Sequence, residues 1–213
     1  AYADAEGHID FTEKLIKRLA KDLKNQTIGV DKKFKRMTFN EALSRYALIS
    51  DFEKLSEKEL ELKAKQFGLE PEKITYRGKF ADEIFKKVCR PKIIEPTFVL
   101  NHPQEISPLA KPAKEQGKAD RYQLIIGGLE IINGFSELND PLKQREFFEN
   151  QEKQKEKGEE ELTPMDEEFL EALEYGMPPA AGFGIGIDRL VMLFTGNANI
   201  KEAIIFPTLR PRQ

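Results

Sequence analysis

The sequence predicts an α+β fold in which an antiparallel β-sheet is flanked by helices. Three observations support this prediction. Apolar residues recur at helical spacing through residues 1–90, whereas β-branched and aromatic runs typical of strands fall within residues 91–213. Two of these runs are joined by Gly127-Gly128, a dipeptide typical of hairpin turns. Strands joined by a hairpin, with helices grouped elsewhere along the chain, indicate an antiparallel sheet rather than a doubly wound one.

Four helices are expected in the first part. The first covers about residues 9–24, where a large apolar residue recurs at every fourth position. Capping boxes at Thr38–Glu41 and Ser56–Glu59 predict the start of two more helices, and Gly68 predicts the end of the second of these. A fourth helix carries the apolar residues between 80 and 88. None of these helices shows a pattern typical of catalysis.

The second part is expected to contain the sheet. Its strands are predicted at 97–100, 122–126 and 129–132, followed by a glycine-rich strand that begins at 182. The remaining predicted elements are a charged helical stretch from Pro141 with a Glu/Lys run at 152–161, a helix at 166–175, an apolar helix that ends near Phe194, and a short strand at Ala203–Phe206.

Composition excludes several kinds of chemistry. The chain has 213 residues, with two histidines, one cysteine and a net charge of −3. These residues are too few for a common four-ligand zinc site and leave little material for a Ser–His–Asp system, and the charge gives no support for nucleic-acid binding. A single cysteine and the lack of a long apolar run predict a cytoplasmic protein without a membrane span. Any chemistry must therefore use carboxylates, arginines and backbone groups, with or without a hard metal ion.

Residues 182–189, which read GFGIGIDR, form the first candidate site. Side chains alternate along a strand, so Gly182, Gly184 and Gly186 leave one face as bare backbone against which a flat group can lie. The spacing matches neither the dinucleotide-binding fingerprint nor the P-loop. Arg189 opens the next helix, from which its side chain can fold back over the glycine face, and its planar guanidinium suits an aromatic base and phosphate oxygens. The alternative is that the glycines allow tight packing and that Arg189 is an ordinary surface residue.

Residues 130–140, EIINGFSELND, form the second candidate site. In an extended segment Asn133, Phe135 and Glu137 share one face. A ring there can cover the apolar stem of an amino-acid side chain while the carboxylate binds its charged end. The alternative is an edge strand with one core aromatic residue and two solvated polar groups.

These stretches resemble class II lysyl-tRNA synthetases. Residues 182–189 and the following apolar helix are similar to motif 3 of class II synthetases, and residues 130–140 are similar to the lysine-binding stretch of the lysine enzymes. Residues 96–111 and 205–211 extend the resemblance, and Ala1–Asp4 resembles the segment just after motif 2. The resemblance covers nearly the whole chain. It implies that residues 1–213 are a partial catalytic domain of the class II fold, with motifs 1 and 2 absent.

The resemblance implies an ATP site. Arg189 would stack on adenine and reach the terminal phosphate as the catalytic arginine, beside the bare face of Gly182, Gly184 and Gly186. Glu130 would bind ATP and its Mg²⁺, which usually needs only one or two protein carboxylates. The sequence departs from the family at Gln123, where a second metal-binding glutamate is usual. An amide oxygen is a neutral and weaker ligand, so the resemblance does not imply full metal loading.

The resemblance also implies a lysine site. Glu137 would receive the ε-ammonium, Phe135 would pack along the methylenes and Asn133 would form the polar edge. The implied activity is lysine–tRNA ligase, with ATP, L-lysine and tRNA(Lys) as partners and a homodimer as the parent state. Two alternatives remain open: a paralogue that lysylates a protein such as elongation factor P, and a non-catalytic nucleotide-binding fragment. Without motifs 1 and 2, the chain is expected to be inactive alone.

Overall fold

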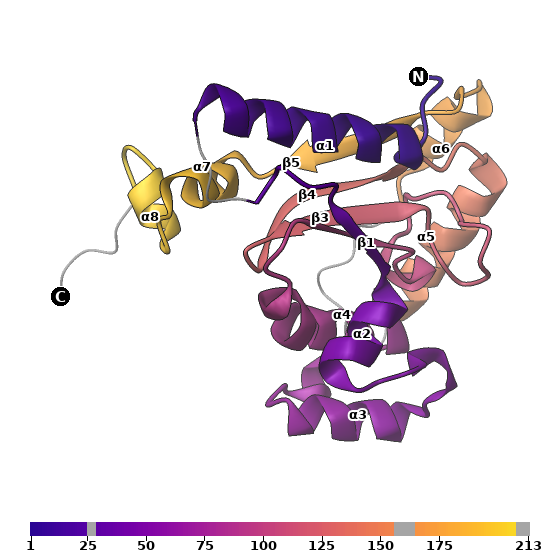
Figure 1. Cartoon of the computed structure of the whole chain (residues 1–213). Coiled ribbons are helices and arrows are strands. Elements are labelled where there is room, and N and C mark those ends of the chain that lie inside the picture. Colours follow the sequence, from indigo (N-terminus) through magenta and orange to yellow (C-terminus); the bar gives the residue numbers. More distant parts are fainter. Residues whose placement is uncertain (25–28, 156–164, 208–213) are drawn as a thin grey trace.

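The computed structural model describes residues 1–24, 29–155 and 165–207 and contains one mixed five-stranded sheet between two helical layers (Figure 1). Helix α1 (Ala5–Asp22) lies along one face of the sheet, and the helical part that follows β1 lies on the other. Two apolar clusters fill the interfaces, one beneath α1 and one among α2, α3 and α4. The predicted α+β class is therefore confirmed.

The sheet has the strand order β1-β2-β3-β4-β5. The strands are β1 (Lys35–Thr38), β2 (Thr97–Leu100), β3 (Arg121–Ile126), β4 (Leu129–Ser136) and β5 (Ala181–Ile185). Strands β2 to β5 pair antiparallel, as predicted, but β1 pairs parallel to β2, so the sheet is mixed. The sequence analysis missed β1 because its four residues, KRMT, show no apolar alternation.

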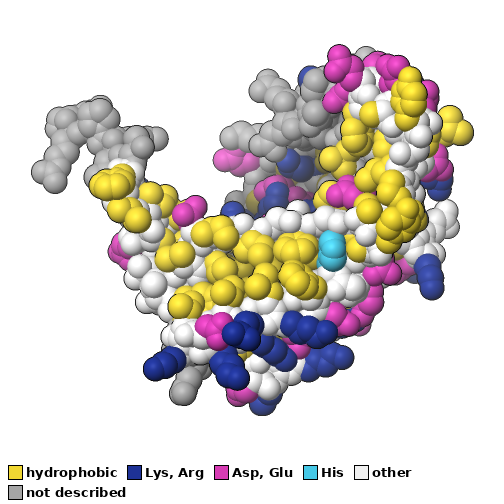
Figure 2. All heavy atoms as spheres, turned by 90° about the horizontal axis from the view of Figure 1, so that it is seen from above, with side chains coloured by type: hydrophobic (Ala, Val, Ile, Leu, Met, Phe, Trp, Pro, Cys, Tyr) yellow, Lys and Arg dark blue, Asp and Glu magenta, His cyan; other side chains and the backbone are white. Residues whose placement is uncertain are grey.

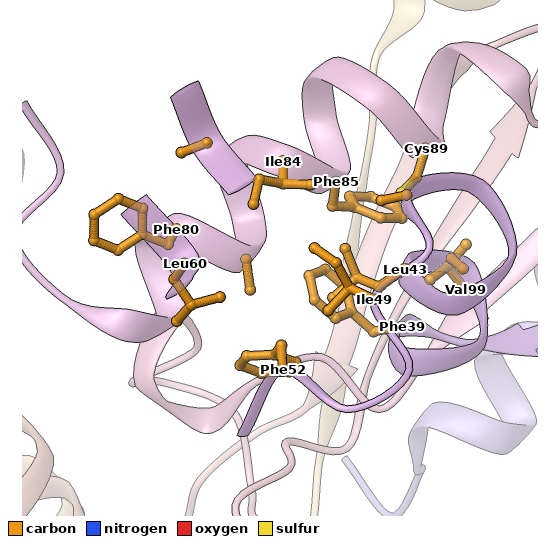
Figure 3. Close-up of a cluster of buried hydrophobic side chains, with 14 of the residues drawn as sticks. Phe39, Leu43, Ile49, Phe52, Leu60, Phe80, Ile84, Phe85, Cys89 and Val99 are labelled. Carbon is orange, nitrogen blue, oxygen red and sulfur yellow. The ribbon is translucent and has the colours of Figure 1, made fainter. Parts of the chain in front are cut away.

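The helical layer forms as its caps predict. Helices α2 (Phe39–Ala47) and α3 (Glu57–Gln66) both begin with complete capping boxes. Helix α4 (Arg77–Ile84) runs into a π-helical turn, Phe85–Cys89, and a 3₁₀ turn, Arg90–Lys92. Their buried side chains converge in the cluster of Figure 3. Cys89 is fully buried there, and burial raises the pKa of its thiol to about 12, so it is a core residue rather than a nucleophile.

Two predictions need correction, one at the start of α1 and one in the C-terminal part. Its helices are α5 (Pro141–Lys155), α6 (Glu167–Glu174), α7 (Ile187–Thr195) and α8 (Ile200–Ala203). The predicted strand Ala203–Phe206 is wrong: Ala203 ends α8, and Ile205 and Phe206 are exposed. The apolar pattern was strand-like, but no strand among the described residues lies beside it to complete a ladder. Helix α1 begins at Ala5, four residues earlier than predicted, because Asp4 caps it.

The end of the predicted Glu/Lys run, 156–161, lies outside the described residues, while 152–155 belong to α5. Three more 3₁₀ turns connect the longer elements at Phe52–Lys54, Pro71–Lys73 and Gln104–Ile106. In the part of the chain that the structure describes, no helix is both long and apolar enough to cross a membrane.

Candidate functional site

Strands β4 and β5 bring the two candidate stretches together. Phe135 lies opposite Gly182 and Asn133 lies opposite Gly184, so the polar face of β4 continues into the bare face of β5. Along β4 and just beyond it, Asn133, Phe135 and Glu137 are partly exposed, while the residues between them are buried. The alternation predicted from the sequence therefore holds at all three positions.

A register shift adds Glu130 to this face. Glu130 lies opposite Ile125 and Asn133 lies opposite Gln123, with the register shifting between Leu124 and Ile125. Directly opposed residues share a face, and so do residues two apart on a strand, so Glu130 and Asn133 point to the same side. Without the extra residue in β4 they would point to opposite sides.

The resulting pocket contains every residue that the sequence analysis assigned to a site. It is an open hollow of about 640 Å³ between β4, β5 and the start of α7. The assigned residues in its lining are Glu130, Asn133, Phe135, Glu137, Gly182, Gly184, Gly186 and Arg189. Both candidate stretches therefore line one pocket.

Glu137 marks one end of the pocket. Burial raises the pKa of its carboxyl group, and no cationic side chain among the described residues pairs with it. A Cβ atom at Gly182 would lie 2.7 Å from Glu137 Oε1, so the carboxylate packs directly on the glycine backbone. This partly desolvated, unpaired carboxylate is suited to a cationic ligand.

Arg121 supports the middle of the pocket and was missed in the sequence analysis. Its Nε donates a hydrogen bond to Asn133 Oδ1 at 3.0 Å, and its Nη1 donates to Ile106 O and Ser107 Oγ at 3.0 Å each. Burial lowers the pKa of Arg121. The Asn133 carbonyl is therefore already engaged, which leaves its amide N–H groups for a ligand. Arg121 lies opposite Phe135, two residues beyond Asn133, so the hairpin brings together two residues that are twelve positions apart in sequence.

Arg189 marks the other end of the pocket. Its Nη1 donates to the backbone oxygen of Glu130 at 3.1 Å, and its Cδ would lie 3.4 Å from a Cβ at Gly186. The side chain thus folds back over the end of β5, as the sequence analysis anticipated. Helix α7 begins at Ile187, whose side chain is exposed.

The residues near Glu130 fit a metal ion only in part. Gln123 is buried and its Oε1 has no hydrogen-bond partner within the described residues. Those residues also contain no cluster of three or more His, Cys, Asp or Glu side chains. One carboxylate and one orphaned amide oxygen suit a Mg²⁺ ion that arrives with nucleotide phosphates, because Mg²⁺ then needs few protein ligands.

Comparison with known proteins decides the family. The family model described as tRNA synthetases class II (D, K and N) matches residues 1–210. The chain belongs to this family. Among curated members, the lysine–tRNA ligase of Lactococcus lactis subsp. cremoris is 43% identical over 99% of this chain and 44% of its own length. Those of Porphyromonas gingivalis and Moorella thermoacetica are 40% and 42% identical over the whole chain, and it covers 38% and 45% of them.

These comparisons confirm the resemblance drawn from motif 3 and the β4 stretch. The chain spans less than half the length of these lysine–tRNA ligases. The match begins at residue 1 and includes both pocket strands, so the α+β fold and the pocket belong to the class II synthetase domain.

Proposed function

We propose that this chain is the lysine- and ATP-binding part of a lysyl-tRNA synthetase. One observation carries the proposal: a single pocket has an unpaired carboxylate, Glu137, at one end and a guanidinium, Arg189, at the other. A carboxylate without a cation suits the ε-ammonium of lysine, and a planar guanidinium suits adenine and phosphate.

Strand β5 sets the distance between the two ends. Gly182 adjoins Glu137 and Gly186 adjoins Arg189. At roughly 3.3 Å per residue, these glycines are about 13 Å apart. Lysine would extend from Glu137 along Phe135 toward Gly184, and the nucleotide would extend from Arg189 toward the same residue. Gly182, expected from the sequence to serve ATP, would then adjoin lysine instead.

The proposed reaction needs no protein nucleophile. The carboxylate of lysine attacks the α-phosphorus of ATP, forming the lysyl-adenylate mixed anhydride and releasing pyrophosphate. A ribose hydroxyl of tRNA(Lys) then attacks the lysyl carbonyl and releases AMP. The described residues contribute to the first step by position and charge: Glu137, Phe135 and Asn133 orient lysine, while Arg189 binds the nucleotide.

A divalent cation would be held by Glu130, with Gln123 as a neutral neighbour. When bound with ATP, Mg²⁺ supplies positive charge that stabilises the phosphates during displacement. We further propose tRNA(Lys) as acceptor and a homodimer as the parent state, on the basis of family membership. The names of the relatives favour the tRNA enzyme over a protein-lysylating paralogue.

The test is amino-acid-dependent exchange of pyrophosphate into ATP by the complete protein that contains this chain. Lysine should support exchange, whereas aspartate and asparagine, the substrates that give the family its other letters, should not. Transfer of radiolabelled lysine to tRNA(Lys) rather than to elongation factor P then distinguishes the acceptor. Exchange driven by aspartate or asparagine would refute the lysine assignment, and lysine transfer to the protein alone would refute the tRNA assignment.

A further inference from the structure

Arg90 lies outside the candidate site as drawn from the sequence, yet its guanidinium faces Glu130. Arg90 Nη1 is 3.7 Å from Glu130 Oε2, and Arg189 Nη1 is 4.0 Å from Glu130 Oε1. Each oxygen of the carboxylate therefore faces a different arginine. Both distances exceed that of a hydrogen bond, so these contacts are electrostatic. Replacing either arginine by another cation at the Glu130 carboxylate would therefore break no short hydrogen bond to that carboxylate.

The backbone fixes Arg90 in this place. The π-helical turn Phe85–Cys89 ends there, and a 3₁₀ turn that contains Pro91 follows. The hairpin turn before Glu130 docks on the next residues: Gly127 N donates to Ile94 O at 2.8 Å, and Gly128 N donates to Ile93 O at 2.9 Å. Arg90 and Glu130 thus lie on two segments that backbone hydrogen bonds hold together.

The charges at this point are unequal. Two guanidinium groups face one carboxylate, and Gln123 on the same face is neutral. The cluster therefore carries net positive charge, which suits the phosphates of a nucleotide. A cation that binds Glu130, however, meets Arg90 as a competitor, because both need the same carboxylate.

We propose that Arg90 is a positioning residue that holds Glu130 from the side opposite Arg189 and competes with a divalent cation for its carboxylate. The identity of that cation as the ion bound with ATP rests on the proposed function. The competition itself rests only on the geometry of Arg90 and Glu130, so it is measurable without a nucleotide.

The experiment measures Mn²⁺ binding to the 213-residue chain by electron paramagnetic resonance, without nucleotide. We expect Arg90→Gln to bind Mn²⁺ about two- to fivefold more tightly than the unchanged chain, the range expected for a partly exposed ion pair. The matched control is Arg36→Gln, since the Arg36 side chain is 30% exposed against 29% for Arg90 and pairs with Glu6 on the α1 side. Circular dichroism checks that each variant is folded.

Double variants and a nucleotide arm complete the test. The gain from Arg90→Gln should vanish in a Glu130→Gln background, because the competition acts through that carboxylate. Gln123→Glu, which adds an anionic ligand on the same face, serves as a positive control. Equal or weaker Mn²⁺ binding by Arg90→Gln, a gain that survives Glu130→Gln, or no binding by any variant would overturn the inference. If Arg90→Gln binds Mn²⁺ more tightly but a non-hydrolysable ATP analogue leaves the Mn²⁺ affinity unchanged, the inference holds and the proposed nucleotide site fails.

Discussion

At the scale of single residues, Glu137 is suited to binding at the expense of stability. Its carboxyl group is partly desolvated, and burial raises its pKa, so protonation is more favourable in the folded state than in the unfolded state. Because the pKa is higher in the folded state than in the unfolded state, folding is stabilised as the pH falls and is penalised above the folded-state pKa. A bound ammonium would reverse this penalty by pairing with the charge.

This predicts that Glu137→Gln stabilises the free chain at neutral pH, because a neutral amide replaces a desolvated anion. The gain should shrink as the pH falls through the pKa of Glu137, where the carboxyl group becomes neutral as well. Urea unfolding at about pH 7 and about pH 4 measures the difference between the two proteins. A variant that is less stable at neutral pH would show that Glu137 has a structural partner in the folded chain.

Arg189 tests whether shape or charge matters at the nucleotide end. Arg189→Ala should reduce ATP use by the complete enzyme by about 100-fold or more, as expected for a preorganised group that meets phosphate charge. Arg189→Lys should recover little, because an ammonium cannot stack on adenine as a plane. The measurement is kcat/KM for ATP in pyrophosphate exchange. Near-normal values in the lysine variant would contradict the stacking role.

At the scale of elements, the glycines of β5 differ in what surrounds them. A methyl group at Gly182 would meet the Glu137 carboxylate at 2.7 Å, whereas nothing lies within 4 Å of one at Gly184. Gly182→Ala should therefore displace Glu137 and raise the KM for lysine by about tenfold, equivalent to about 1.4 kcal/mol. Gly184→Ala, the same change on the same face, should leave the stability of the free chain unchanged in thermal unfolding. Equal lysine KM values for Gly182→Ala and the wild type would contradict this placement.

The predictable elements are those with local causes. Side-chain caps at Thr38 and Ser56 start helices regardless of what packs on them, so the sequence predicted both. Strand β1 depends on pairing with β2, since each residue of Lys35–Thr38 pairs with one 62 positions later, and it has no pattern of its own. The strand-like run at Ala203–Phe206 has the opposite problem, since its pattern is present but a pairing strand is not.

The candidate site likewise combines features with local causes, which the sequence predicts, and features that depend on tertiary contacts, which it does not. Alternation along one strand predicted that Asn133, Phe135 and Glu137 share a face, and motif spacing predicted that Arg189 folds back over the glycines. The bulge that turns Glu130 to that face is a property of two paired strands, so alternation alone could not locate it. Arg121 and Arg90 reach the site only through tertiary contacts.

At the scale of the whole molecule, β5 lies at the edge of the sheet beside an apolar surface. Figure 2 shows hydrophobic side chains gathered on the α1 side around a histidine. Phe11 is 54% exposed there and packs beside Phe183, whose ring also meets His8. An unpaired edge and an exposed apolar face both favour association with another chain.

We therefore expect the 213-residue chain to self-associate and to be a poor catalyst alone. Its lysine-dependent pyrophosphate exchange should fall at least about 100-fold below that of a complete synthetase. The reason is that no stretch of these 213 residues resembles motif 1 or motif 2, so the groups that align the α-phosphate are not supplied. Light scattering and the exchange assay on the same sample measure both properties. A monodisperse monomer with exchange within tenfold of a complete enzyme would refute this expectation.

The most direct test of the two-ended pocket is a crossed measurement of KM values in the complete enzyme. Glu137→Gln should weaken the use of lysine by about 2–5 kcal/mol, the usual effect of removing one partner of a desolvated charge pair, and should leave the KM for ATP nearly unchanged. Arg189→Ala should do the reverse. A Glu137→Gln enzyme with an unchanged KM and kcat for lysine would contradict the account, because the pocket would then bind lysine without the carboxylate that defines its end.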